Sequence, residues 1–218
     1  MNRKYTAWKK NRNLGDIAGG RQKLKCEDNI LRREHTFVSP SSEEEIPVLI
    51  QENPSRDFYF PITAIEARDY LQTFPPEDVA GITHLWLKRL KSKEYDLPAR
   101  PLAEYIWGSG VYLIVIYPWA RNGLLHFGNR RPSAKVLGRY KRWTTDLIEN
   151  DGMWCLRWTK DAVRDFYFTG ILAHEVGHHC DKNRSSAANN KQREETAEQY
   201  ALRWMPNGQK LYSIEDLV

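Results

Sequence analysis

Leu172–Cys180 reads Leu-Ala-His-Glu-Val-Gly-His-His-Cys, and the rest of the chain is organised around this stretch. Within it, His174 and His178 are four residues apart, and Glu175 follows the first histidine directly. Residues four apart lie on one face of an α-helix, about one turn from each other. Two imidazoles at that separation can bind one Zn²⁺, and Glu175 can then reach a metal-bound water as a general base. The spacing therefore predicts a metal site, provided that the stretch is helical.

The residues before the motif predict a helix that begins near Thr159. Thr159 is a suitable N-cap, and Asp161 in the first turn suits the helix dipole. Gly170 and Gly177 are seven residues apart, and each costs about 1 kcal/mol in a helix interior. That cost is tolerated where another backbone approaches closely, so we expect a close neighbour on that side. Apolar and ligand positions recur at the three- and four-residue steps of an amphipathic helix: Val163, Phe166, Gly170, Ile171, His174 and His178.

The pattern His-Glu-x-x-His is typical of zinc-dependent hydrolases, although three fixed residues also arise by chance. A pair of histidines four apart can equally be a packed or solvated feature of a helix surface. The helical period, the apolar flank and a completing ligand downstream favour the metal interpretation. His179 points about 100° away from His178, so we expect it to be a neighbour of the site rather than a ligand.

A catalytic zinc site usually has three protein ligands, so a third ligand is expected further along the chain. No histidine follows His179, and the position ten after His174 is Arg184, which excludes a third histidine there. Lys191–Met205 is predicted to be a second helix that ends before Pro206. The candidates are the downstream carboxylates: Asp181, Glu194, Glu195, Glu198, Glu215 and Asp216.

Glu194 and Glu198 lie on the mostly apolar face of this second helix, whereas Glu195 falls on its flank. A carboxylate on a buried face needs a partner, because a bare buried charge is costly. This argument selects Glu194 as the third ligand. It makes Glu198, one turn further on, the acceptor of a hydrogen bond from a ligand imidazole. Glu195 and Glu198 remain alternative ligands, and an acidic, solvated helix face is the alternative to any role in the site.

Further residues carry a resemblance to a known family. His-Glu-Val-Gly-His is followed by Glu194-x-x-Ala197-Glu198-x-Tyr200-Ala201 and then by Trp204-Met205-Pro206. This arrangement resembles the zincin-type metallopeptidases whose third ligand is a glutamate (gluzincin-like), and it is most similar to the ImmA/IrrE-like family. The resemblance covers Phe166–Pro206 and places Glu194 in the ligand position. It implies a zincin fold and peptidase chemistry, often directed at a regulatory protein. The chain departs from the family pattern at Glu198, where the family has Asn and related zincins have Asp.

The composition predicts one globular domain with a substantial core, since the 218 residues are 41% hydrophobic and include eight tryptophans. No apolar run approaches the ~20 residues that span a bilayer, and the polar N-terminus lacks the apolar segment of a secretory signal. Cys26, Cys155 and Cys180 are odd in number and scattered, which suits a reducing compartment. We therefore expect a cytoplasmic protein without a membrane segment.

Positive charge is concentrated near the N-terminus. Residues 1–34 hold ten Lys/Arg and four Asp/Glu, a balance of +6, whereas the whole chain has 33 − 28 = +5. Tyr5 and Trp8 are interleaved with these cations, which suits a nucleic acid or an acidic partner. A solvated basic tail is the alternative. Composition thus separates a basic N-terminal arm and linker (residues 1–45) from residues 46–218, which the resemblance implies are a zincin-like metallopeptidase domain.

Upstream of the motif the sequence predicts strands. Val111–Tyr117 is the most apolar run and is expected to be a central strand, paired with Glu104–Trp107. Asn122-Gly123 is typical of a hairpin turn into Leu124–Phe127, and Met153–Trp158 is predicted to be the last strand before the metal helix. Strands followed by two ligand-bearing helices predict an α+β fold, in which a mixed β-sheet packs on the motif helix. A strand edge beside the metal would align an extended peptide, and the last two strands are the candidates for that edge.

Taken with the resemblance, these patterns predict a zinc-dependent metallopeptidase that hydrolyses a peptide bond in a protein or peptide substrate. Zn²⁺ would be bound by His174, His178 and Glu194, while Glu175 takes a proton from the water and passes it to the leaving amine. A further oxyanion donor (a Tyr, His or Arg) is expected but not assigned. Two alternatives remain: a zincin-fold binding or regulatory module without turnover, and a protease associated with nucleic acid through residues 1–34.

Overall fold

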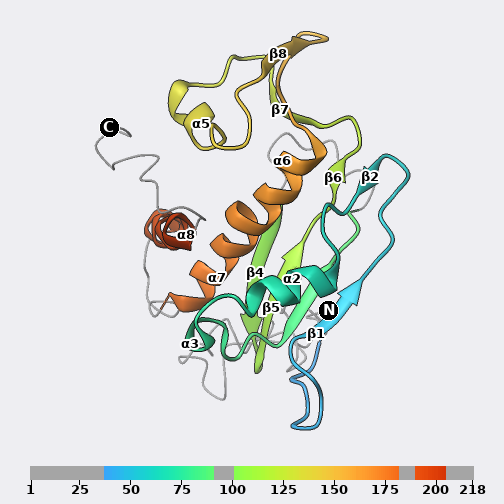
Figure 1. Cartoon of the computed structure of the whole chain (residues 1–218), viewed down its shortest axis with the longest axis vertical. Helices are drawn as coiled ribbons and strands as arrows, with labels where there is room; N and C mark the ends of the chain where they lie inside the picture. The colour runs from blue at the N-terminus through green and yellow to red at the C-terminus, as the bar shows by residue number, and fades with distance from the viewer. Residues whose placement is uncertain (1–36, 91–100, 182–189, 205–218) are drawn as a thin grey trace, which may run out of the picture.

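A computed structural model describes residues 37–90, 101–181 and 190–204 (Figure 1). Its largest sheet has four strands in the order β1-β3-β5-β4. The first three strands run parallel, and β4 pairs antiparallel with β5 and forms one edge. The fold is therefore α+β with a mixed sheet, as the sequence predicts. The strands span Val48–Gln51 (β1), His84–Leu87 (β3), Val111–Ile116 (β5) and Ala103–Gly108 (β4).

Strand β5 joins the two apolar cores of the protein. Ile114 and Ile116 belong to the larger core, which lies between the sheet and the helices, and both are fully buried. Leu113 and Val115, on the alternate positions, belong to a smaller core on the opposite face. Because the strand is buried on both faces, it reads as a continuous apolar run. The prediction that this run is a central strand is confirmed.

Helix α2 and the long helical run α6–η2–α7 cross the same face of the sheet (Figure 1). Thr63 and Glu66 form a capping box at the start of α2, so each side chain accepts a hydrogen bond from the other residue's backbone N–H. Glu66 also binds Arg164 on α6 at 2.7 Å, which links the two helices. The helices span Ala64–Leu71 (α2), Pro76–Val79 (α3), Lys160–Asp165 (α6), Phe166–Leu172 (η2), Ala173–Cys180 (α7) and Asn190–Trp204 (α8).

The helical run that ends in the motif begins at the predicted N-cap. The Thr159 hydroxyl accepts a hydrogen bond from the backbone N–H of Ala162, and Asp161 lies in the first turn. The middle of the run, η2, is π-helical rather than α-helical, which the sequence pattern does not predict. The Thr169 hydroxyl donates to the backbone carbonyl of Asp165 at 2.8 Å within this segment. π-Helical turns are often found next to functional sites, and here one directly precedes the motif helix.

Gly177 sets how closely α8 approaches α7. A Cβ atom at Gly177 would lie 2.7 Å from the Cα of Ala197 and 2.9 Å from its carbonyl oxygen. The expected close backbone neighbour is therefore found at Gly177. Gly170 differs, because its neighbours are the side chains of Phe166 and Trp143. The expectation of a backbone neighbour is wrong for Gly170.

Two smaller sheets extend the molecule beyond the central one. One pairs β2 with β6, and the other has the order β7-β9-β8. The turn at Asn122-Gly123 joins β6 to β7, which pair in different sheets, so the predicted hairpin is wrong. The reason is that the Gly123 carbonyl accepts the backbone N–H of Trp158 at 2.9 Å, which directs β7 to β9. These strands and the helix between them span Phe58–Tyr59 (β2), Trp119–Ala120 (β6), Leu124–Gly128 (β7), Ala134–Gly138 (α5), Leu147–Asn150 (β8) and Met153–Arg157 (β9).

Two predictions concern the membrane and the N-terminal arm. None of the described helices is both long and apolar enough to cross a membrane. Residues 1–36, which make up most of the predicted arm, lie outside the described part of the chain. The partners predicted for residues 1–34 and the domain division at residue 45 therefore stay predictions.

Candidate metal centre

His174, His178 and Glu194 meet where α7 packs on α8. The imidazole Nε2 atoms of His174 and His178 lie 3.3 Å and 3.5 Å from the two carboxylate oxygens of Glu194. The two rings stand perpendicular, with their centroids 4.7 Å apart. One potential ligand atom from each residue lies within 4.8 Å of the other two. The three side chains thus form a group that can hold one metal ion, and they come from the two helices that the sequence predicts.

The structure distinguishes between the neighbouring glutamates of α8. Glu195 turns away from the imidazoles and pairs with Lys191 at 3.7 Å. Glu198 lies close enough for its charge to help raise the pKa of His174. Nδ1 of His178 has no hydrogen-bond partner among the described residues, so Glu198 does not accept a hydrogen bond from that ring. The wider role expected for Glu198, as the acceptor for a ligand imidazole, stays a prediction.

Glu175 lies beneath the group with only 6% of its surface exposed. Burial, together with the charges of Glu194 and Glu104, raises its pKa to about 7, although His174 opposes the shift. One carboxylate oxygen, Oε2, is buried without a hydrogen-bond partner among the described residues. An unpartnered buried oxygen is costly unless a hydrogen-bond donor occupies the space in front of it. A water beside a cation held by the three ligands would supply that donor, so the residues fit a metal ion.

The protonation of the group also fits a cation. Burial lowers the pKa of His174, but the hydrogen bond to Glu194 and the surrounding carboxylates outweigh burial, so the net shift is upward. Burial and the nearby charge of His174 lower the pKa of His178 to about 4. The hydrogen bond with His174 lowers the pKa of Glu194. The carboxylates around His174 therefore favour positive charge at the place where a bound metal ion would bring it.

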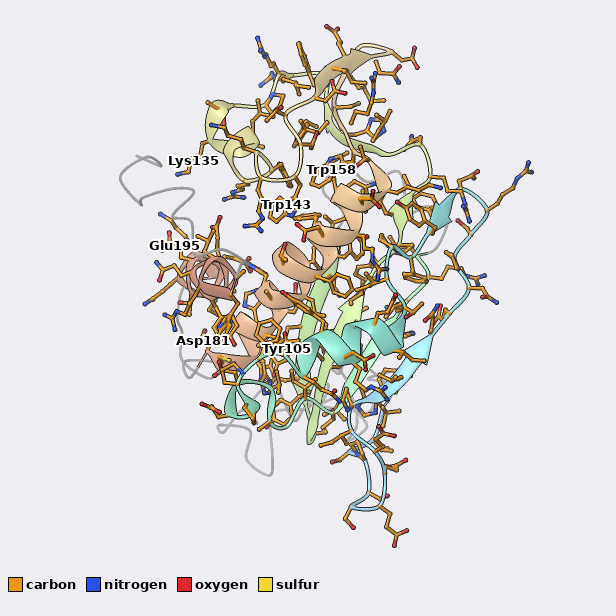
Figure 2. All side chains as sticks on the ribbon, in the orientation of Figure 1. Tyr105, Lys135, Trp143, Trp158, Asp181 and Glu195 are labelled. Carbon is orange, nitrogen blue, oxygen red and sulfur yellow. The ribbon has the colours of Figure 1, made fainter. Side chains whose placement is uncertain are left out.

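His179 anchors the motif helix instead of binding the metal. Its Nδ1 lies 2.8 Å from the hydroxyl of Tyr105 on β4, and its Nε2 lies 2.9 Å from the carbonyl oxygen of Ala80. Tyr105, labelled in Figure 2, therefore lies beside the last turn of α7. With both ring nitrogens engaged, His179 is a neighbour of the site, as the sequence predicts. The hydrogen bonds also fix α7 against the sheet edge, and sequence spacing gave no sign of partners 74 and 99 residues away.

Strand β4 borders a polar cleft in front of the three ligands. The cleft has a volume of about 940 Å³. Arg193 lines it and places its guanidinium 4.8 Å from the ring of Trp107 and 4.0 Å from Asp181. The edge strand beside the site is therefore β4, and the sequence prediction of β7 or β9 for that edge is wrong. Strand β9 lies in the middle of its own sheet, with β7 and β8 on either side. The cleft is lined by Lys88, Pro101, Ala103, Glu104, Tyr105, Ile106, His174, Glu175, His178, Arg193 and Glu194.

A second, mostly apolar cavity of about 410 Å³ opens on the other side of the same residues. It lies between η2, α8 and the chain around the C-terminal end of α5 (Figure 1). His174, Glu175 and Glu194 line both spaces, so the group lies at the junction of a polar cleft and an apolar cavity. The apolar lining includes Leu102, Tyr140, Trp143, Phe166, Ile171, Ala201 and Leu202.

Comparison of the chain with family models, curated proteins and solved structures gives no match. The functional argument therefore depends on the site itself. The sequence locates the His-His-Glu group and Glu175, but it does not place Tyr105 and the predicted strand β4 beside them. Tyr105 and β4 reach the site through contacts between distant segments, which no local spacing reveals. Arg193 directly precedes Glu194, but its position in the cleft depends on the same packing.

Proposed function

We propose that the protein is a zinc-dependent metallopeptidase, similar to the ImmA/IrrE-like zincins, that hydrolyses a peptide bond in a protein substrate. One observation carries the proposal. Three convergent side chains that can hold one metal ion lie next to a buried Glu175, whose Oε2 has no hydrogen-bond partner among the described residues. A purely structural metal site would not need a buried, unpartnered carboxylate beside its ligands.

His174, His178 and Glu194 are the residues that would hold the metal. A bound Zn²⁺ supplies an activated water and polarises the substrate carbonyl. Glu175 takes the proton from the attacking water, because its carboxylate lies beside the three ligands and its Oε2 is not engaged by any described residue. Glu175 then donates that proton to the departing amine. Its burial keeps the carboxylate away from competing solvent.

The exposed edge of β4 is where we place the substrate. Ala103, Glu104, Tyr105 and Ile106 line the polar cleft, and among the described residues β4 pairs with β5 alone. An extended peptide can add to such an edge by backbone hydrogen bonds. This position would carry the peptide past Glu175 and the ligands. Arg193 lines the same cleft and is the cation that we propose to stabilise the developing negative charge on the carbonyl oxygen.

Glu175→Gln tests the proposal because it keeps the shape of the side chain and removes the base. We expect the variant to bind one zinc ion as the wild type does and to lose about 10²–10⁴-fold in peptide cleavage. Zinc content by mass spectrometry and cleavage of a peptide library measure the two properties. A variant that cleaves as fast as wild type would exclude Glu175 as the base. Full zinc occupancy without cleavage of any peptide by the wild type would favour a binding or regulatory module without turnover.

A further inference from the structure

The segment from Asn129 to Trp143, which contains α5, carries six cations and no Asp or Glu. We call it the basic segment. Its cations lie on an exposed loop and short helix above the apolar cavity (Figure 1), and all except Arg142 are exposed. Outside residues 1–34 the chain holds 33 − 10 = 23 Lys/Arg and 28 − 4 = 24 Asp/Glu, so its positive and negative charges nearly cancel. The basic segment, which has cations only, departs sharply from this balance of charge. The six cations are Arg130, Arg131, Lys135, Arg139, Lys141 and Arg142.

Two of these cations border the cavity that reaches the metal ligands. Arg139 and Arg142 line the cavity together with His174 and Glu194. Arg142 lies 4.0 Å from Asp165 on α6, so its charge is partly compensated. Arg139 is exposed and forms no ion pair with any described residue. The mouth of the cavity therefore has a guanidinium that is available to a bound molecule.

Aromatic contacts hold the basic segment in a fixed position. The Trp143 indole N–H donates to the Asp165 carboxylate at 2.8 Å, and its ring lies 4.7 Å from the ring of Phe166. Figure 2 shows Trp143 between the basic segment and the helical run. Tyr140 contacts Phe166 and Phe127 with ring centroids 6.0 Å and 5.9 Å apart. Arg139 is thus carried by a segment that packs on the helical run bearing His174 and His178, not by a freely moving loop.

We propose that the basic segment binds an acidic stretch of the protein substrate, next to the residue that enters the apolar cavity. This inference rests on the proposed peptidase function and adds the substrate class. The substrate is a peptide in which an apolar residue is flanked by Asp or Glu, and the acidic residues lie against α5. Charge complementarity with Arg139 and its neighbours gives the preference, and the position of the cavity beside Glu175 places the acidic stretch close to the scissile bond.

A peptide fits this surface better than a nucleic acid. Glu194 and Glu198, on α8, line the same cavity as Arg139, and Glu195, which lies between them in the sequence, is exposed. A polynucleotide carries a phosphate at every position, so it would bring negative charge against these carboxylates as well. A peptide can place acidic residues against the basic segment and neutral residues against α8. The arrangement of charge on the two walls therefore favours a protein ligand.

The test compares three fluorescence-quenched peptides that differ only in a block of three flanking residues. The block is three Asp in the first peptide, three Asn in the second and three Lys in the third. The full-length protein loaded with zinc is used as wild type and as Arg139→Glu. Arg56→Glu is the matched control, because it makes the same charge change at an exposed arginine that lines neither space. We expect kcat/KM for the Asp peptide to exceed that for the Lys peptide about fivefold or more. The preference should disappear in Arg139→Glu, persist in Arg56→Glu and weaken with added salt.

A binding measurement separates failure of this inference from failure of the proposed function. Glu175→Gln is titrated with the same peptides and with a single-stranded oligonucleotide. Cleavage of all three peptides at equal rates would overturn the acidic preference and leave the peptidase proposal standing. If no peptide is cleaved, binding of the Asp peptide that Arg139→Glu abolishes still supports the basic segment as its site. Binding of the oligonucleotide with a steep salt dependence, and of no peptide, would overturn the inference in favour of a nucleic acid.

Discussion

Glu175 has three properties that bear on a role as general base: it is buried, its surroundings raise its pKa to about 7, and its Oε2 has no hydrogen-bond partner in the described part of the chain. Its neighbours explain the combination. Burial alone would favour the neutral acid, and the charges of Glu194 and Glu104 add to that effect, while His174 opposes it. A bound metal ion would add positive charge beside the carboxylate. That charge would favour the ionised carboxylate, which is the form that accepts a proton.

A pH-dependent prediction concerns Glu66, away from the site. Its hydrogen bond with Arg164 and the backbone N–H of Thr63 lower its pKa to about 2. A lowered pKa stabilises the folded protein fully above the ordinary value near 4.5, and this stabilisation is lost as the pH falls from about 4.5 towards 2. Because the pair is largely exposed, we expect it to contribute at most about 1 kcal/mol.

Glu66→Gln measures that contribution, because Gln can still complete the capping box. The variant should unfold at a lower temperature than wild type at pH 7, and the difference should shrink as the pH approaches 3. Glu43→Gln removes the same charge from an exposed position and should leave the stability unchanged at both pH values. A difference between Glu66→Gln and wild type that grows as the pH falls would contradict the assignment.

Among single residues, the sequence predicts the His-His-Glu group that the structure brings together. His174, Glu175 and His178 follow from helical periodicity, and Glu194 follows from the choice of helix face. Arg139 and Tyr105 could not be predicted in the same way. Their importance depends on which strand and which loop reach the site, and the sequence gives no spacing that connects them with the motif.

Among the elements, the contact between α7 and α8 matters most, because each helix supplies part of the ligand group. Gly177 makes the contact possible, and a side chain there would meet the backbone of Ala197, which cannot move aside easily. We expect Gly177→Ala to destabilise the protein by about 1–3 kcal/mol through overpacking, despite the ~1 kcal/mol that alanine gains in a helix. It should also weaken zinc binding, since Glu194 would move away from the imidazoles.

Gly138→Ala is the matched control for that change. Gly138 lies in α5, and a Cβ atom there meets nothing within 4 Å. Alanine should therefore leave the stability unchanged or raise it by up to about 1 kcal/mol. Chemical denaturation followed by circular dichroism measures both variants. Equal stabilities for Gly177→Ala and Gly138→Ala would show that the helices do not pack as closely as described.

The sequence predicts elements where a local signal determines the outcome. The N-cap at Thr159 and the apolar run of β5 carry such signals. The turn at Asn122-Gly123 shows where a local signal is not enough, because the same dipeptide can form a hairpin turn or connect strands of two different sheets. The π-helical segment Phe166–Leu172 carries no distinctive spacing, since apolar residues at three and four steps fit an α-helix equally well.

In the whole molecule, four segments that are distant in the sequence meet at the site. Strand β4 gives an edge, α7 and α8 give the ligand group, and the basic segment gives a charged rim to the apolar cavity. Each segment is held by packing on the central sheet or on the helical run. This arrangement explains why composition and motif predict an α+β metalloprotein, while the route of a substrate through it requires the three-dimensional structure.

The central claim is that His174, His178 and Glu194 bind one metal ion together, and zinc affinity in two neighbouring α8 variants tests it most directly. Glu194 and Glu195 are adjacent, and their side chains are similarly exposed, at 64% and 56%. Calorimetric titration of the metal-free proteins should give one zinc ion per chain for wild type and Glu195→Gln at equal affinity. Glu194→Gln should bind zinc at least about tenfold more weakly. Equal zinc affinity in Glu194→Gln and Glu195→Gln would contradict the claim.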